Sequence, residues 1–289
     1  MDPKVFLTIN GHQSDALPVS DRGFAYGHGL FETLLYHDSA LPLFDRHISR
    51  LFHDARLLAI TLDEGEVIRY IREFLALLHS RDYRYGTVKI VVTAGSGTRG
   101  YQTPEQQESR VICQYFPFQA DGSPGDKMQY QEGVKLWQCD YRLPANRQLA
   151  GIKHLNRLDQ VLARTEWRDE TFVDGIVMNQ SGLLIESTSA NIFCRFGRKW
   201  LTPSLEEAGV AGIMRSLLIE EIFPLLQLPV KISAIPLEQM EKCEEVFICN
   251  SVKGVIPVTC VKEIAQWSVG EQTKMVQSAL AEKYPAFHD

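Results

Sequence analysis

The stretch on which the interpretation of this chain depends is the hexapeptide Gly151-Ile152-Lys153-His154-Leu155-Asn156. Lys153 is the lone lysine in a segment that is otherwise uncharged, and Glu186 follows it 33 residues later. Glu186 ends an apolar run and is followed by the polar run Ser187-Thr188-Ser189-Ala190-Asn191. This pairing of an amine and a carboxylate suits a Schiff-base lysine and the partner of a protonated pyridine ring, which is the chemistry of pyridoxal phosphate.

This chemistry makes a specific demand on each side chain. A lysine that condenses with an aldehyde must lose its proton, and an ordinary lysine pKa near ~10.4 prevents that loss at neutral pH. Burial or a nearby cation lowers the pKa of a lysine, and the apolar neighbours Ile152 and Leu155 fit a partly buried position. Glu186 has the opposite task, because it must stay ionised beside the ring nitrogen. Either residue taken alone is more typical of a solvated surface, so the role of both has to be judged from the rest of the sequence.

Further segments match a known family in the same order along the chain. The segment 21–33 contains an Asp-Arg-Gly opening, a Gly-x-Gly and an aromatic-Glu pair. With Lys153 and Glu186, the chain resembles over nearly its whole length the fold-type IV family of pyridoxal phosphate enzymes, which includes branched-chain and D-amino acid aminotransferases and aminodeoxychorismate lyases. The resemblance implies a mixed α/β (α+β) fold of two domains, similar to D-amino acid aminotransferase, that binds pyridoxal 5'-phosphate. The other matching segments are 44–51, 209–215 and 248–251, the last one ahead of Pro257.

Within this family, the segments 150–162, 95–101 and 245–250 are similar to those of the aminodeoxychorismate lyases of bacterial folate biosynthesis. This likeness implies a homodimeric carbon-oxygen lyase that converts 4-amino-4-deoxychorismate into 4-aminobenzoate and pyruvate. The first alternative is an aminotransferase for D-amino acids or branched-chain substrates, which rapid glutamate production from an amino acid and 2-oxoglutarate would favour. The second is a non-catalytic pyridoxal phosphate-binding protein, which a persistent cofactor absorption band without turnover would favour.

The resemblance also implies roles for individual residues on the cofactor side. Lys153 would be the catalytic residue that carries the cofactor, and Glu186 would pair with its ring nitrogen. Arg50 would bind the phosphate, a task that suits a planar guanidinium because it binds two oxygens at once. The backbone N–H groups that open a helix near 212–214 would add unpaired donors and the helix dipole. The remaining cofactor-binding residues that the resemblance implies are Asn191, Gly212, Ile213, Met214, Asn250 and Ser251, and it implies no metal ligand.

Two residues are assigned to the substrate side. Phe31 has no hydroxyl, so its predicted role is packing rather than hydrogen bonding. Arg99 lies in the glycine-rich segment 95–101, and it is the candidate for a substrate carboxylate, with a mobile surface turn as an equal alternative. The glycine spacing matches GxGxxG only formally, because no adjacent helix and no Lys-Ser/Thr ending support a phosphate loop. His28 occupies a position that is often acidic in the family, and the sequence does not explain this difference.

The composition is that of an ordinary globular enzyme. The chain has 289 residues, of which 45% are hydrophobic, and a formal net charge of -6 with both signs interspersed. The absence of a basic stripe argues against a nucleic-acid partner. Six cysteines without CxxC spacing indicate reduced thiols. Because no secretory signal and no apolar stretch of ~18 residues is found, we expect a cytoplasmic protein without a membrane partner.

The segment from Pro117 to Gly125 is rich in Pro, Gly, Asp and Ser and predicts a linker. We therefore expect a smaller N-terminal α/β domain at 1–118 and a larger C-terminal α/β domain at 119–289 that carries Lys153. Apolar spacing predicts the secondary structure within them. The expected strands are 5–12, 29–36, 88–93, 110–116, 134–139, 174–179, 183–193 and 245–249, and the expected helices are 45–59, 67–78, 155–167, 212–226 and 271–283.

Overall fold

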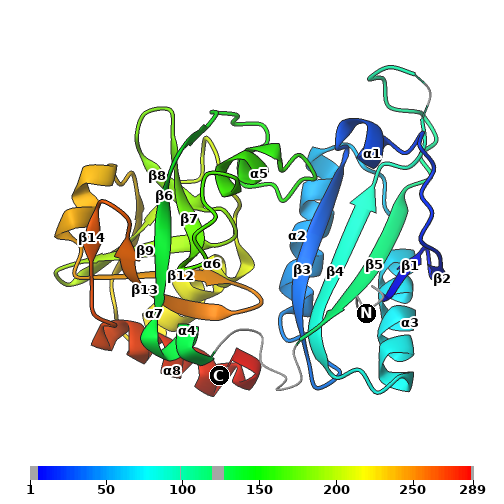
Figure 1. The fold of residues 1–289 in the computed structure, drawn as a ribbon. Coiled ribbons are helices and arrows are strands. Elements are labelled where there is room, and N and C mark those ends of the chain that lie inside the picture. The colour runs from blue at the N-terminus through cyan, green and yellow to red at the C-terminus, as the bar shows by residue number, and fades with distance from the viewer. Residues whose placement is uncertain (1–5, 98, 119–126, 288–289) are drawn as a thin grey trace. The chain divides into compact units, whose positions relative to one another are not determined.

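A computed structural model describes residues 6–97, 99–118 and 127–287 of the chain (Figure 1). The chain forms two compact units. Unit 1 comprises Met1–Pro124 and Lys153–Asn156, and unit 2 comprises Gly125–Ile152 and Arg157–Asp289.

The short segment Lys153–Asn156 belongs to unit 1, although the residues before and after it belong to unit 2. The sequence analysis assigned Lys153 to the second domain and placed the domain boundary after residue 118. The difference arises from backbone hydrogen bonds between this segment and a strand of unit 1, described below. Most of the predicted linker at 117–125 lies outside the described residues.

Unit 1 contains an antiparallel sheet whose strands lie in the order β2-β1-β5-β4-β3 (Figure 1). Strand β3 pairs with β4 along its whole length, from Gly29 opposite Thr93 to His37 opposite Tyr85. More and less buried positions alternate along β4, as expected for a strand with one face packed on a core. The strands are β1 Phe6–Ile9, β2 His12–Gln13, β3 Gly29–His37, β4 Tyr85–Thr93 and β5 Arg110–Pro117.

Helices α2 (Phe44–Leu57) and α3 (Glu64–Ser80) pack against this sheet, α2 next to β3 and α3 next to β5 (Figure 1). Both helices were predicted from their apolar spacing and are confirmed. Helix α2 ends before Ala59, whose φ of 52° lies in the left-handed region. Asp63 is the N-cap residue of helix α3, and its side chain accepts a hydrogen bond from the Glu66 N–H at 2.8 Å.

A short helix, α1 (Arg22–Tyr26), precedes β3. Asp21 caps its first turn by accepting a hydrogen bond from the Gly23 N–H. Gly27 ends the helix with a φ of 65°, a left-handed conformation that glycine adopts without steric cost. The cap and the terminator together turn the chain into β3, which carries Phe31 and Glu32.

Unit 2 contains a mixed sheet in the order β11-β10-β9-β12-β13-β6-β7-β8, with β14 paired to β13. Strands β6, β7 and β13 run parallel, and most of the other neighbours are antiparallel. The strands are β6 Val134–Leu143, β7 Phe172–Asn179, β8 Leu184–Ser187, β9 Asn191–Phe196, β10 Lys199–Pro203, β11 Val230–Ser233, β12 Glu245–Asn250, β13 Gly254–Val261 and β14 Ala265–Gln266.

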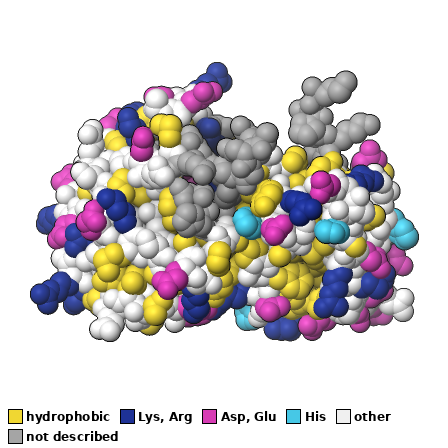
Figure 2. Space-filling model, turned by 90° about the horizontal axis from the view of Figure 1, so that it is seen from below, with side chains coloured by type: hydrophobic (Ala, Val, Ile, Leu, Met, Phe, Trp, Pro, Cys, Tyr) yellow, Lys and Arg dark blue, Asp and Glu magenta, His cyan; other side chains and the backbone are white. Residues whose placement is uncertain are grey.

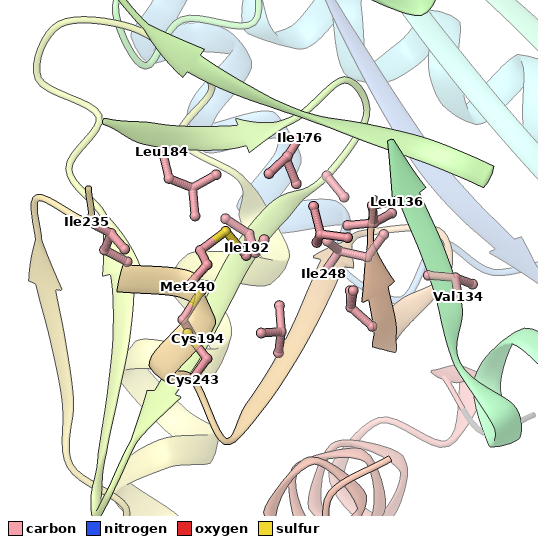
Figure 3. Packing of buried hydrophobic residues seen from close by; sticks show 14 of the residues in the cluster. Val134, Leu136, Ile176, Leu184, Ile192, Cys194, Ile235, Met240, Cys243 and Ile248 are labelled. Carbon is pink, nitrogen blue, oxygen red and sulfur yellow. The ribbon is translucent and has the colours of Figure 1, made fainter. Parts of the chain in front are cut away.

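The core of unit 2 is built from side chains of these strands and of the 3-10 helix η2 (Leu237–Lys242). Figure 3 shows how Leu136, Ile176, Ile192 and Ile248 from separate strands converge with Met240. The helices of unit 2 are α4 Lys127–Glu132, α5 Leu158–Arg164, α6 Ile213–Leu217, α7 Phe223–Leu225 and α8 Glu271–Lys283, with the π-helical η1 Leu218–Ile222 between α6 and α7 and the 3-10 helix η3 Pro285–Phe287 after α8.

Several predicted elements of unit 2 differ from the structure in their boundaries. Helix α8 has the predicted bounds, and the segment predicted as one helix at 212–226 consists of α6, η1 and α7. The helix predicted at 155–167 is shorter, because residues 153–156 pair with β3 instead. The strand predicted at 183–193 was wrong as a single element, since a turn separates β8 from β9.

All six cysteines are free thiols, and Cys260 is the least buried of them. In the described part of the chain, no helix is long and apolar enough to cross a membrane. On the face shown in Figure 2, positive and negative side chains lie interspersed with hydrophobic ones. Within the described residues, no group of His, Cys, Asp and Glu side chains is arranged to hold a metal ion.

An aromatic cluster in unit 2 tests how strongly the packing stabilises the fold. The fully buried ring of Phe247 stacks on Phe193 with 4.9 Å between ring centroids and lies equally close to Trp200. We expect Phe247→Ala to lower the free energy of unfolding by about 3–5 kcal/mol, because truncation leaves a cavity. The control Leu225→Ala removes a side chain that is 61% exposed and should change it by less than about 0.5 kcal/mol. Urea unfolding followed by tryptophan fluorescence measures both, and equal losses would contradict the packing described here.

Candidate active site

Lys153 is held in unit 1 by its backbone. Its carbonyl oxygen accepts a hydrogen bond from the Phe31 N–H at 3.0 Å, and its N–H donates to Asp54 Oδ2 at 3.3 Å. Two residues further on, the Leu155 N–H donates to the Gly29 oxygen at 3.0 Å. The segment therefore extends the pairing of β3 on the edge that β4 does not occupy. A Cβ at Gly29 would lie 2.6 Å from Leu155 Cδ1, so glycine permits this close approach.

The side chain of Lys153 lies over an aromatic ring. Its Nζ is 4.3 Å from the centroid of the Phe31 ring, and the Nζ of Lys89 lies 5.1 Å from the same centroid. Lys89 projects from β4, where it is half-buried, and burial lowers its pKa. Phe31 therefore contacts two amines. Its packing role was predicted from the sequence, but Lys89 was missed, because an alternating strand pattern does not show which ring a lysine approaches.

A buried carboxylate orients the side chain of Arg50. Glu32 of β3 accepts hydrogen bonds from Arg50 Nε at 2.8 Å and from Arg50 Nη2, and it also binds His47 Nδ1 at 2.6 Å. Glu32 is 1% exposed. Burial alone would raise the pKa of Glu32, but the charge of Arg50 and the hydrogen bonds from His47 and Arg50 outweigh it and lower the pKa to about 2. Glu32 is therefore ionised and holds the guanidinium in a fixed orientation.

His47 is neutral in this arrangement. Burial lowers its pKa, and the hydrogen bond with Glu32 opposes that effect only in part. Because the carboxylate of Glu32 can only accept, Nδ1 carries the proton and Nε2 is left as an acceptor. Nε2 is buried and has no hydrogen-bond partner among the described residues. A buried polar atom without a partner is unusual, and here it lies beside Arg50 on the same helix.

Glu186 lies in unit 2, on β8, and is 4% exposed. Its Oε2 accepts a hydrogen bond from the Val210 N–H at 2.8 Å. Gly209 makes this contact possible: it has a φ of 91°, and a Cβ there would lie 2.8 Å from Ile185 Cγ2 and 3.2 Å from Glu186 Oε2. Burial lowers the pKa of Arg157, and the negative charge of Glu186 opposes that shift, which places this cation within electrostatic reach of the carboxylate.

Asn191 also fixes the turn that contains Gly212. The Asn191 amide donates to the Val210 oxygen at 2.9 Å, and its Oδ1 would lie 1.9 Å from a Cβ at Gly212. The same stretch forms a bridge with Gly151, whose N–H donates to the Gly209 oxygen and whose oxygen accepts from the Ala211 N–H, both at 2.9 Å. Glu186 and Asn191 thus hold the two backbone groups of Val210 just before helix α6 begins.

Asp174 organises the turn between β8 and β9, and the sequence analysis did not identify it. It is 4% exposed and accepts hydrogen bonds from the hydroxyls of Ser187, Thr188 and Ser189 at 2.8, 2.5 and 2.6 Å. Its carboxylate also accepts the N–H groups of Thr188 and Ser189. This explains why the predicted strand is interrupted. The consecutive hydroxyl residues were the available signal, because Ser and Thr compete with ladder pairing by bonding locally.

The structure places the remaining predicted residues as follows. Ile213 and Met214 are buried in the first turn of α6, with Gly212 as the N-cap residue. Asn250 closes the turn between β12 and β13, because its Oδ1 accepts the N–H groups of Val252 and Lys253 at 3.0 and 2.8 Å. Ser251 follows in the same turn, and Arg99 is exposed in unit 1.

The chain is similar to known proteins over most of its length. The family model described as amino-transferase class IV matches residues 29–261. The chain is 31% identical over 276 residues to the aminodeoxychorismate lyase of Vibrio harveyi, which covers 94% of this chain and 98% of the relative. The crystal structure of 4-amino-4-deoxychorismate lyase from Pseudomonas aeruginosa is 36% identical with a TM-score of 0.88, covering 96% of this chain and 98% of that chain.

The fold extends to aminotransferases. The branched-chain amino acid aminotransferase of Escherichia coli has a TM-score of 0.86 at 19% identity, covering 98% of this chain and 96% of that one, a likeness of fold. The chain belongs to the amino-transferase class IV family. The predicted fold-type IV architecture and its mixed α/β class are confirmed.

The buried pair of Glu32 and Arg50 predicts a pH dependence of stability. The pKa of Glu32 falls from 4.5 to about 2 on folding, so its stabilisation is fully present above pH 4.5 and is lost as the pH falls toward 2. We expect Glu32→Gln to lower the free energy of unfolding at pH 7 by about 3 kcal/mol and to flatten its decline between pH 4.5 and 2. The control Glu66→Gln alters a glutamate that is 59% exposed. Urea titrations at several pH values test this, and an unchanged slope in Glu32→Gln would count against it.

Alanine substitutions at two glycines with similar backbone conformation distinguish the cost of left-handed strain from the cost of crowding next to Glu186. Gly209 has a φ of 91° and close neighbours, whereas Gly182 has a φ of 75° and open space where a Cβ would lie. We expect Gly182→Ala to cost about 1–2 kcal/mol through left-handed strain alone. Gly209→Ala should cost about 1–3 kcal/mol more, because its methyl group would lie within 3 Å of Leu205 and Ile185 and 3.2 Å from Glu186 Oε2. Denaturant unfolding of both variants measures the difference, and equal costs would show that Glu186 does not depend on Gly209.

Proposed function

We propose that this protein is a pyridoxal phosphate-dependent lyase that converts 4-amino-4-deoxychorismate into 4-aminobenzoate and pyruvate. The observation that carries the proposal is Lys153, whose backbone is fixed against β3 and whose amine lies on the Phe31 ring. Similarity over nearly the whole chain to proteins named as lyases of this substrate supports the choice of reaction. Folate biosynthesis, a cytoplasmic location and assembly as a homodimer are part of the same proposal.

The residues present fit the proposed cofactor. Its phosphate would lie at Arg50, whose guanidinium is oriented by Glu32. Unit 2 by itself offers a separate group of donors that suits a phosphate, namely the backbone N–H groups at Gly212, Ile213 and Met214 and the hydroxyl of Ser251. Glu186 would accept a hydrogen bond from the protonated ring nitrogen. Asn191 would hold the turn at Val210 in place.

The chemistry can be divided between the cofactor and the chain. When bound, pyridoxal phosphate supplies an electron sink for the carbanion that forms at the amine-bearing carbon of the substrate. Lys153 would hold the cofactor through Nζ and, once displaced by the substrate amine, its amine would take the proton from that carbon. The enolpyruvyl group would then leave with the electron pair of the broken carbon–oxygen bond, as the enolate of pyruvate, which becomes pyruvate by gaining a proton at carbon, and the ring that remains is aromatic. The chain orients the bonds that break and keeps the amine within reach of the proton.

The carboxylates of the substrate require cations on the substrate side. Arg99 is the proposed partner of one carboxylate, because a guanidinium binds its two oxygens together. Lys89 is a second candidate in unit 1, since its half-buried amine approaches the same Phe31 ring as Lys153. The lowered pKa of Lys89 follows from burial, and an anionic ligand would offset that effect by stabilising the charged amine.

The direct test is to supply enzymatically prepared 4-amino-4-deoxychorismate and to follow 4-aminobenzoate and pyruvate together. We expect equal amounts of both products from the cofactor-loaded protein. Lys153→Ala should lower the rate by about a thousandfold or more, because it removes both the attachment point and the base. The control Lys274→Ala, a lysine that is 52% exposed on α8, should keep full activity.

Two outcomes would reject the proposal. Full activity of Lys153→Ala would show that this amine is not the base. Rapid formation of glutamate from 2-oxoglutarate and an amino acid, without 4-aminobenzoate from aminodeoxychorismate, would identify an aminotransferase of the same family instead.

A further inference from the structure

The guanidinium of Arg22 is nearly buried and collects backbone oxygens from one loop. Arg22 is 3% exposed, and its Nη2 donates to the Tyr101 oxygen at 2.9 Å. Its Nη1 donates to the oxygens of Gly100 and Gln102, both at 3.3 Å. Three consecutive carbonyl groups thus point at one side chain. These residues directly follow Arg99, the proposed partner of a substrate carboxylate.

Other contacts hold the same loop against α1. The Gly100 N–H donates to the Tyr26 hydroxyl at 3.3 Å, and the rings of Tyr26 and Tyr101 pack with 5.4 Å between centroids. The Arg22 guanidinium also lies 5.1 Å from the centroid of the Tyr26 ring. Gly97 packs directly on Arg22, because a Cβ at this position would be 3.1 Å from Arg22 Cδ. The loop is therefore attached to α1 through both Arg22 and Tyr26.

His28 supplies the remaining partner of Arg22. Arg22 Nε lies 3.2 Å from His28 Nδ1, and His28 Nε2 lies 2.7 Å from the Leu58 oxygen. Because the guanidinium can only donate, Nδ1 must accept, and Nε2 must carry the proton that it donates to Leu58. Leu58 is the C-cap residue of α2, the helix that carries Arg50 and Asp54. His28 thus connects the arginine that holds the loop to the helix that positions Arg50 and the Lys153 backbone.

Arg22 has no carboxylate partner among the described residues, although Asp21 beside it pairs with Arg110 at 2.8 Å. Its partners are carbonyl oxygens and a neutral imidazole. A buried cation without a counterion is costly unless its hydrogen bonds are satisfied. The burial of Arg22 is therefore tied to the loop carbonyl groups and to the His28 imidazole that it binds.

We infer that Arg22 and His28 are positioning residues that hold the loop at 99–102 so that Arg99 is presented to the substrate. The inference rests on the proposed function for the identity of the substrate carboxylate. Neither residue needs to contact the substrate. They restrict the conformations of the loop before the substrate binds. Less conformational entropy is therefore lost when Arg99 becomes ordered on binding.

Steady-state kinetics of the cofactor-loaded protein test this role. Arg22→Gln should raise the KM for aminodeoxychorismate about tenfold or more, with kcat changed less than about threefold and an unchanged cofactor absorption spectrum. Because Arg22 is buried, His28→Leu provides a milder test at a less buried position, with KM raised about threefold. His28→Gln, which keeps one acceptor and one donor, should return KM close to that of the unmodified protein. The control Arg84→Gln, at an arginine that is 52% exposed in unit 1, should leave KM unchanged.

A double-mutant cycle distinguishes positioning from general damage. If Arg22 acts through Arg99, then Arg22→Gln adds little to the KM of Arg99→Gln, and the two effects are not additive. Additive effects, or a fall in kcat with no change in KM, would overturn the inference.

Hydrogen exchange of the amides at 99–102 provides a readout that does not depend on activity. We expect these amides, including the Gly100 N–H, to exchange about tenfold faster in Arg22→Gln and faster in His28→Leu, with Arg84→Gln unchanged. Equal exchange in all variants would reject the positioning role. A protein that lacks lyase activity but shows the faster exchange would reject the proposed function and leave the attachment of the loop to Arg22 in place.

Discussion

Backbone hydrogen bonds fix Gly151 within unit 2 and Lys153 within unit 1, and the position of the candidate lysine depends on this constraint. Gly151 pairs with the turn at Gly209, and the Lys153 carbonyl pairs with the Phe31 N–H. The position of the lysine Cα is therefore set by main-chain pairing, which a side-chain substitution leaves intact. Only the flexible stem of Lys153 remains to place the amine, and the Phe31 ring gives it a surface to lie on.

The charges around Arg50 depend in the same way on fixed partners. Glu32 is buried and ionised, and it stays so because Arg50 and His47 both donate to it. Two parallel bonds from Arg50 to Glu32 require a planar guanidinium, and a lysine at this position would lose that geometry. His47 remains neutral, so the cluster carries one positive and one negative charge rather than an excess of either. Under the proposed function, the cofactor phosphate would bind the guanidinium of Arg50, which is already oriented, while Glu32 keeps its buried charge.

Local pattern and family resemblance predicted different parts of this structure. Helix α2 and strand β4 were predicted from the residue pattern alone, because each buries mainly one face. The resemblance assigned roles to Lys153, Arg50 and Glu186, which remain predictions, but the partners that these side chains have in the structure could not be read from the sequence. Glu32 and Arg50 are 18 residues apart on different elements, and Asp174 reaches Thr188 across a strand connection. Such contacts depend on how elements pack, and neither composition nor periodicity records that.

The hydrogen-bond partner of Glu186 shows that this side chain also holds the backbone next to helix α6. Its carboxylate binds the Val210 N–H, while Asn191 binds the Val210 oxygen, so one peptide unit on each side of Val210 is held by a side chain from β8 or β9. The glycines at 209 and 212 leave room for these two side chains, since a Cβ at 212 would lie 1.9 Å from Asn191 Oδ1 and one at 209 would lie 3.2 Å from Glu186 Oε2. The turn that opens helix α6 and the carboxylate assigned to the ring nitrogen are consequently parts of one hydrogen-bonded arrangement. A change in the charge of Glu186 would therefore act on the proposed phosphate-binding turn as well as on the ring, because the Val210 N–H is its direct partner.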